Sequence, residues 1–96
     1  MRIDKVFEFQ WDKGNLGKNV NHNVTDVEAE QVFFDERKFI FKDKLHSTNE
    51  LRYRIIGKTK GKRLLFVAFT KRKGKVRIIS ARDINKKEVY LYEKAT

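Results

Sequence analysis

The sequence of 96 residues contains no cysteine and no proline. Without cysteine the chain can form neither a disulfide framework nor a thiolate metal site. Its two histidines, His22 and His46, are too few for a zinc site without help from carboxylates. We therefore expect no bound metal and no other cofactor.

Long apolar runs are also missing. No stretch approaches the ~18 consecutive apolar residues that a membrane span needs. The first residues have no apolar run after their charges, so we expect no secretory signal and a cytoplasmic protein without membrane contact. There is no Gly/Ser-rich linker and no internal repeat, so a single domain over residues 1–96 is expected.

Positive charge is abundant and concentrated in the second half of the chain. Residues 1–50 hold eight Lys and Arg against ten Asp and Glu, whereas residues 51–96 hold fifteen against three. Between Lys58 and Arg77 there are nine basic residues and no acid. Clustered positive charge attracts polyanions, because binding releases their counterions. A solvated basic face is the plainer alternative, but this one-sided excess favours a polyanion partner.

The pattern of apolar residues predicts an α+β fold built on an antiparallel sheet. Strands are expected at residues 6–11, 38–42, 51–58, 63–71 and 75–81. The last three would form a meander, with Gly61 and Gly74 supplying positive φ in the turns, and the one or two N-terminal strands would join it. Thr25 and Glu28 form a capping box that starts one helix, and a second helix is expected from about Asp83. We expect the helices to pack on one face of the sheet.

Arginines occur inside the predicted strands, and their positions there require an explanation. Alternation puts Arg52 and Arg54 on one face of their strand. Arg77 would share a face with Ile79 and Ala81, although an apolar face normally excludes an unpaired charge. Guanidinium groups bind phosphate oxygens in bidentate fashion, and several on one surface could stabilise a phosphorane transition state without metal. A salt bridge to Glu28, Glu50 or Glu88 is the structural alternative for any single arginine.

Segments along nearly the whole chain resemble the BrnT family of toxins from bacterial type II toxin–antitoxin modules. The similar segments are Phe7-Glu8-Phe9-Gln10-Trp11-Asp12, His22-Asn23-Val24-Thr25, His46-Ser47 with Glu50 and Arg52-Tyr53, Ile56-Gly57-Lys58-Thr59, residues 63–70, Arg77-Ile78-Ile79-Ser80-Ala81-Arg82 and Glu88 with Tyr92-Glu93. The resemblance implies a RelE-like fold and an endoribonuclease that blocks translation. It also implies neutralisation by a BrnA-type antitoxin with a ribbon-helix-helix DNA-binding domain, in a heterotetramer.

From the basic strands and this resemblance we predict the residues of the site. Arg63, Arg77 and Arg82 are predicted to hold phosphate, and His22 to carry acid–base chemistry, since its unperturbed pKa lies near neutrality. Further contacts to RNA are predicted for Arg52, Arg54, Lys62, Arg72 and Lys75. Two alternatives remain, namely an RNA- or DNA-binding module without catalysis and a subunit whose basic face docks an acidic protein.

Overall fold

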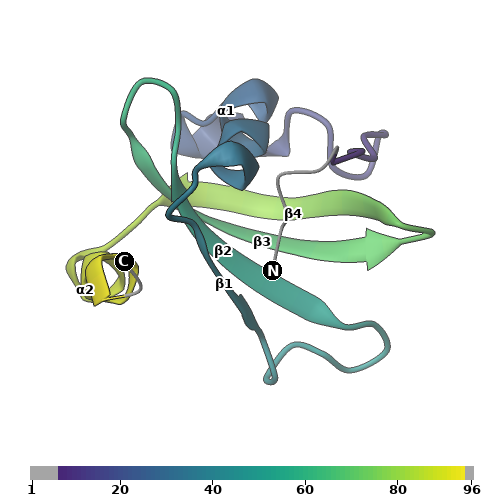
Figure 1. The fold of residues 1–96 in the computed structure, drawn as a ribbon. Helices are drawn as coiled ribbons and strands as arrows, with labels where there is room; N and C mark the ends of the chain where they lie inside the picture. Colours follow the sequence, from purple (N-terminus) through teal and green to yellow (C-terminus); the bar gives the residue numbers. More distant parts are fainter. Residues whose placement is uncertain (1–6, 95–96) are drawn as a thin grey trace.

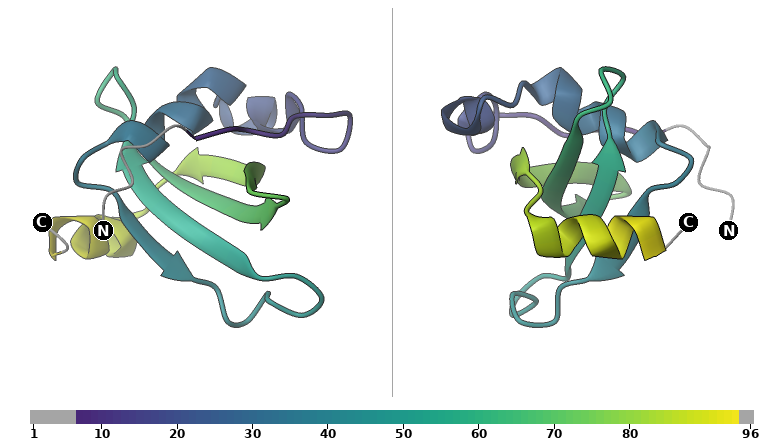
Figure 2. Two further views of the ribbon diagram at one scale, coloured as in Figure 1. Left: turned by 45° about the vertical axis from the view of Figure 1, so that its right-hand side comes forward. Right: turned by 90° about the vertical axis from the view of Figure 1, so that its left-hand side faces the viewer.

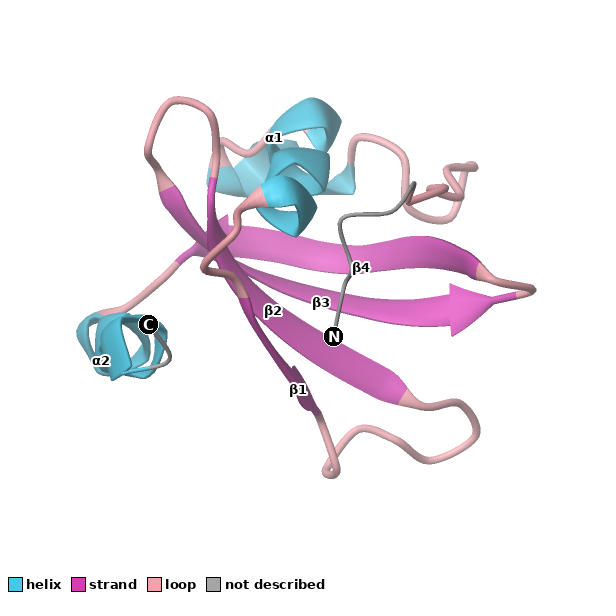
Figure 3. Cartoon of the chain, viewed as in Figure 1, coloured by secondary structure: helices cyan, strands magenta, loops and turns pink. Residues whose placement is uncertain are grey.

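One antiparallel sheet forms the centre of the computed structural model, which describes residues 7–94 (Figure 1). Its strands, in the order β1-β2-β3-β4, are β1 (Phe39–Lys42), β2 (Arg52–Lys58), β3 (Leu64–Arg72) and β4 (Lys75–Asp83). The three C-terminal strands form the predicted meander, and the strand predicted at residues 38–42 adds one edge. With two α-helices beside the sheet, this confirms the α+β class (Figure 3).

The two basic turns of the meander are built differently. Between β3 and β4, Lys73 and Gly74 have φ values of 52° and 80°, as a two-residue type I′ hairpin turn requires. The expectation for Gly74 is therefore confirmed. Between β2 and β3 it is Lys62 (φ 66°), and not Gly61, that has positive φ, so the expectation for Gly61 is wrong. The amide of Lys62 donates to the carbonyl of Thr59 at 2.9 Å and stabilises this conformation.

One face of the sheet is covered by α1 (Asp26–Gln31) and the 3-10 helix η2 (Val32–Phe34) (Figure 1). The capping box is confirmed, because Thr25 Oγ1 accepts from the Glu28 amide at 3.1 Å and Glu28 Oε1 accepts from the Thr25 amide at 3.0 Å. Val32 packs tightly on the sheet, since a Cβ at Gly57 would lie 2.7 Å from its carbonyl oxygen. Gly57 therefore allows this close approach.

The second helix, α2 (Lys86–Lys94), lies against the opposite face (Figure 2). Its Tyr92 packs on Ile56 and Phe66, whereas the neighbouring Ile55 belongs to the core under α1. The prediction that the helices share one face is therefore wrong, because Ile56 of β2 and Phe66 of β3 form an apolar area on the face opposite α1, and α2 covers it. No helix within residues 7–94 is long and apolar enough to span a membrane.

The start of α2 also differs from the prediction. Asp83 ends β4, and Asn85 caps the helix: its Oδ1 accepts from the Glu88 amide at 3.0 Å, while Glu88 Oε1 accepts from the Asn85 amide at 3.0 Å. The strand continues two residues beyond the predicted end at position 81, because Asp83 still pairs with Leu65 of β3.

The strand predicted at residues 6–11 is reduced to one parallel bridge between Phe9 and Val76 of β4. Val6 lies outside the described residues. Phe7 and Phe9 both contact the ring of Phe33, with centroids 5.5 Å and 5.3 Å away, so aromatic packing holds the segment more than a hydrogen-bond ladder does. The 3-10 helix η1 (Lys18–His22) follows and lies along β4, where Asn19 Oδ1 accepts from the Ala81 amide at 2.8 Å.

A β-bulge in β4 changes the face on which Arg77 lies. Ala68 pairs with Ser80 but Phe69 pairs with Ile78, so Ile79 is an extra residue. As a result Ile78 and Ala81 are both buried under α1, and Arg77 faces the other side. The expectation that Arg77 shares a face with Ala81 is therefore wrong, since strict alternation stops at the bulge.

Candidate functional site

Most of the predicted RNA-contacting residues gather on the face of the sheet opposite α1. Directly paired residues of antiparallel strands share a face, and Thr70 of β3 is paired with Arg52 of β2 and with Arg77 of β4. We call this surface the arginine face, and its basic residues are Arg52, Arg54, Arg72, Lys75, Arg77 and Arg82. The structure thus brings six predicted residues from three strands onto one surface.

Short side chains on β3 separate the arginines of the two flanking strands. On one side, Ala68 and Thr70 of β3 are paired with Arg54 and Arg52 of β2. On the other side they are paired with β4. Thr70 is fully buried, and its hydroxyl donates to the carbonyl of Leu51 at 2.6 Å. The centre of this face therefore leaves space for the long arginine side chains to lie across it.

Two guanidinium groups converge on the ring of Phe66. The Cζ atom of Arg54 lies 5.1 Å from the ring centroid and that of Arg82 lies 4.4 Å from it. Cation–π attraction of this kind is worth about 0.5–2 kcal/mol. Two guanidinium groups held near one ring bring several N–H donors together, which suits a phosphate group.

Arg54 is also held by Asp43 in the loop before β2. Its Nε donates to Asp43 Oδ2 at 2.8 Å, and the same oxygen lies 2.9 Å from Nδ1 of His46. Burial would raise the pKa of Asp43, but the hydrogen bonds from Arg54 and His46 outweigh it and hold the pKa below its usual value. Asp43 is therefore ionised at neutral pH, between an arginine and a histidine.

Arg82 is held at the start of α2. Its Nη1 and Nη2 donate to the two carboxylate oxygens of Glu88 at 2.9 Å and 2.7 Å. Burial raises the pKa of Glu88, but the hydrogen bonds from Arg82 lower it. The net result is a pKa below the usual value. Because Glu88 also completes the cap with Asn85, this bidentate pair links the arginine face to α2.

Arg77 joins β4 to the N-terminal segment. Its Nη1 and Nη2 donate to Asp12 at 2.7 Å and 3.0 Å, and Nη1 donates to Gln10 at 3.2 Å. These hydrogen bonds are the largest reason why the pKa of Asp12 is lowered. Gly14 makes room for the contact, since a Cβ there would lie 2.6 Å from Nη2. Arg77 thus has a structural role whatever else it binds.

The remaining basic residues of the prediction differ in their contacts. Arg72 Nε donates to Glu50 at 2.7 Å, and this contact is the main cause of the lowered pKa of Glu50. Within residues 7–94 the side chain of Arg52 forms no ion pair, and Lys75 is exposed in the β3–β4 hairpin. Lys62 lies in the other turn, on the side of α1.

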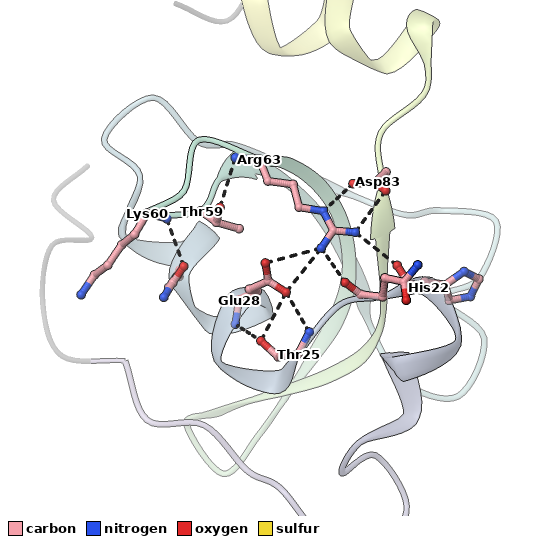
Figure 4. Close-up of polar contacts among 9 residues, drawn as sticks. His22, Thr25, Glu28, Thr59, Lys60, Arg63 and Asp83 are labelled. Carbon is pink, nitrogen blue, oxygen red and sulfur yellow. Dashed lines mark hydrogen bonds and ion pairs between the residues drawn. The ribbon is translucent and has the colours of Figure 1, made fainter.

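Arg63 and His22 lie apart from the arginine face, beside α1 (Figure 4). Arg63 donates to Asp83 at 2.7 Å and 3.1 Å, to the carbonyl oxygens of Asn23 and His22 at 2.5 Å and 3.2 Å, and to Glu28 at 3.4 Å. The imidazole of His22 points away from this guanidinium. The four predicted catalytic residues are thus divided between two places, with Arg77 and Arg82 on the arginine face.

Asp43 was missing from the predicted site, and His46 was not assigned a role. Their spacing of three residues in a turn, with Ser47 beside them, was the available signal. Pairing of Asp43 with Arg54, eleven positions later, depends on how β1 and β2 align and could not be deduced from local spacing.

Comparison with known proteins identifies the family of the chain. A family model described as "Ribonuclease toxin, BrnT, of type II toxin-antitoxin system" matches residues 11–88, which include the whole sheet and the start of α2. No curated protein sequence matches the chain significantly. The predicted resemblance is confirmed: the chain belongs to the BrnT family of ribonuclease toxins of type II toxin–antitoxin systems.

Proposed function

We propose that the protein is a metal-independent endoribonuclease that cleaves RNA in the cytoplasm and thereby blocks translation. The observation that carries this proposal is the arginine face, above all the convergence of Arg54 and Arg82 on Phe66. In RNA the 2′-hydroxyl can act as the nucleophile, so the protein needs to supply a base, an acid and stabilisation of negative charge. Arginine side chains can stabilise the negative charge in place of a metal ion.

Within this site we assign phosphate binding to Arg82, Arg77, Arg52 and Arg54, with Arg72 and Lys75 along the path of the RNA. Arg63 we assign to the fold, because its nitrogens donate to Asp83, Glu28 and two carbonyl groups and none is left for phosphate. His22 stays a prediction for acid–base chemistry, and Lys62 one for RNA binding outside the arginine face.

The family works in toxin–antitoxin pairs, so an antitoxin partner follows from membership. We propose a BrnA-type antitoxin with a ribbon-helix-helix DNA-binding domain in a heterotetramer. An acidic segment of it would cover the arginine face and compete with RNA there, since both partners carry negative charge.

The proposal is tested by incubating the partner-free protein with end-labelled RNA in excess EDTA, with and without ribosomes. Discrete fragments that end in a 2′,3′-cyclic phosphate are expected. RNA that binds but stays intact in both reactions would contradict the proposal and favour the non-catalytic binding module.

Arg52→Ala tests whether RNA lies on the arginine face. Since Arg52 forms no ion pair within the described chain, the fold should remain, while the slope of log affinity against log salt should fall by about one. Lys60→Ala in the β2–β3 turn, equally a loss of one charge but on the side of α1, should leave the slope unchanged. An identical slope for both variants would place the RNA elsewhere.

A further inference from the structure

In the loop before β2, one carboxylate oxygen of Asp43 contacts both His46 of the same loop and Arg54 of β2. We propose that His46 is the general base of the cleavage reaction, oriented by Asp43, and that Arg54 binds the scissile phosphate beside it. This inference rests on the proposed ribonuclease function and names the residues that would carry it out.

The geometry at Asp43 suits this role for His46. Nδ1 of His46 lies 2.9 Å from Asp43 Oδ2, so the neutral ring keeps its proton on Nδ1 and presents Nε2 as an unprotonated base. The side chain of Asp43 is 10% exposed and that of His46 is 54% exposed. A largely covered carboxylate therefore holds an imidazole that remains accessible to a bound RNA.

The same carboxylate prepares Arg54 for phosphate. Only Nε of Arg54 donates to Asp43, and within residues 7–94 its two terminal nitrogens donate no hydrogen bond. The guanidinium lies over the Phe66 ring and its side chain is 23% exposed, so the two terminal nitrogens can form a bidentate contact with phosphate oxygens. Arg54 and His46 contact the same oxygen of Asp43, so the proposal puts a phosphate bound to Arg54 within reach of the imidazole.

Hydrogen bonds inside the loop hold His46 in place. Ser47 Oγ donates to the carbonyl of Asp43 at 2.6 Å and accepts from the amide of Arg52 at 2.9 Å. The amide of Asp43 donates to the carbonyl of Arg52 at 2.8 Å, which closes the loop at its base. Pre-organisation of this kind is what a catalytic base requires.

The reaction step balances without a further reactant. Nε2 of His46 accepts the proton of the 2′-hydroxyl, the 2′ oxygen forms a bond to phosphorus, and the bond between phosphorus and the 5′ oxygen breaks. The 5′ oxygen takes a proton from water, and the resulting hydroxide takes the proton back from the imidazolium. The products are a 2′,3′-cyclic phosphate and a 5′-hydroxyl end.

The alternative is that Asp43, His46 and Arg54 only fasten the loop to the sheet. Loss of His46 would then change stability, but an added base could not restore cleavage. The experiment therefore compares His46→Ala with the unmodified protein of 96 residues on a labelled mixed-sequence RNA oligonucleotide, with ribosomes if cleavage needs them. Thr48→Ala controls for changes in the same loop, and His22→Ala tests the other histidine.

We expect His46→Ala to lower the cleavage rate about 100-fold or more, with RNA affinity retained, and added imidazole to restore part of the rate. Arg54→Lys should weaken RNA binding about tenfold, because a lysine cannot form the bidentate contact. Cleavage by His46→Ala at the normal rate, or loss of cleavage only in His22→Ala, would overturn the inference and leave the ribonuclease function standing. No cleavage by the unmodified protein would overturn both.

Discussion

At the scale of single residues, the arginines differ in how many of their N–H donors are already used inside the protein. Every nitrogen of Arg63 donates to an acceptor of the fold, and these acceptors come from the last residue of η1, the residue after it, α1 and the end of β4. Arg54, in contrast, uses only Nε within residues 7–94. A guanidinium without spare donors stabilises structure, and one with spare donors can bind a ligand.

Arg63→Met should therefore lower the free energy of unfolding, by about 1–3 kcal/mol, because Asp83 and two backbone carbonyls lose a charged donor while the aliphatic stem is retained. Urea unfolding followed by circular dichroism measures the change. Lys87→Met, at an exposed position, should unfold at the wild-type urea concentration. Equal stability of the two variants would contradict the structural role of Arg63.

The sequence correctly indicated arginine as the main residue type of the candidate site, but it did not show which arginines lie together in the fold. Arginines inside strands indicated a phosphate-binding surface, and six of the predicted residues share the arginine face. Yet Arg63 was grouped with Arg77 when both were predicted to lie in strands, whereas β3 begins at Leu64, and nothing in the local sequence shows that the two arginines lie on different sides of the sheet. Their partners, Asp83 for one and Asp12 for the other, are 20 and 65 positions away.

At the scale of elements, hydrogen bonds at helix starts and turns are set by residues close in sequence. The capping box at Thr25 and the type I′ turn at Gly74 were both predictable for this reason. The second helix was placed too early, because Asp83 can cap a helix as well as Asn85 can. Only the pairing of Asp83 with Leu65 keeps it in β4.

Thr25→Ala removes one acceptor from the start of α1 and should destabilise the protein by about 1 kcal/mol. The helix has only six residues and carries buried Ala29, so its first turn bears directly on the core. The midpoint of urea unfolding measures the effect. Thr48→Ala, the same substitution in an exposed turn, serves as the control, and an equal shift for both would contradict the capping role.

At the scale of the whole molecule, the acidic half of the chain folds onto the basic half. Asp12, Glu28, Asp43 and Glu50 come from residues 1–50, and each pairs with an arginine from residues 51–96. Although the net charge is +10, these carboxylates lie next to arginines and reduce the repulsion among them. This arrangement predicts how stability depends on pH.

The fold should lose stability in acid. The pKa values of these four carboxyl groups, and of Asp83 and Glu88, lie below their ordinary values in the folded protein. The unfolded chain therefore binds more protons, so the stabilisation is complete above the ordinary values of 3.8 for Asp and 4.5 for Glu and is lost as the pH falls through the lower folded values.

Urea unfolding at neutral pH and at about pH 3 measures this loss. The midpoint should fall in acid, and added salt should recover part of it by screening the remaining positive charges. Equal midpoints at the two pH values would show that the ion pairs contribute nothing to folding.

The sequence by itself determined what depends on near neighbours and on composition. The approximate positions of the four strands of the sheet, the capping box, the positive φ of Gly74, the basic second half and the family resemblance follow from residue types at short spacing. Their physical reason is local: backbone preferences and hydrogen bonds between residues a few positions apart.

Tertiary structure alone decided which residues meet. The bulge at Ile79 turned Arg77 off the core face, and apolar residues on both faces of β2 and β3 drew α2 to the side opposite α1. Packing of the loop at Asp43 against β2 placed His46 beside Arg54. These contacts join distant parts of the chain, and their geometry depends on strand register and on the burial of the whole sheet.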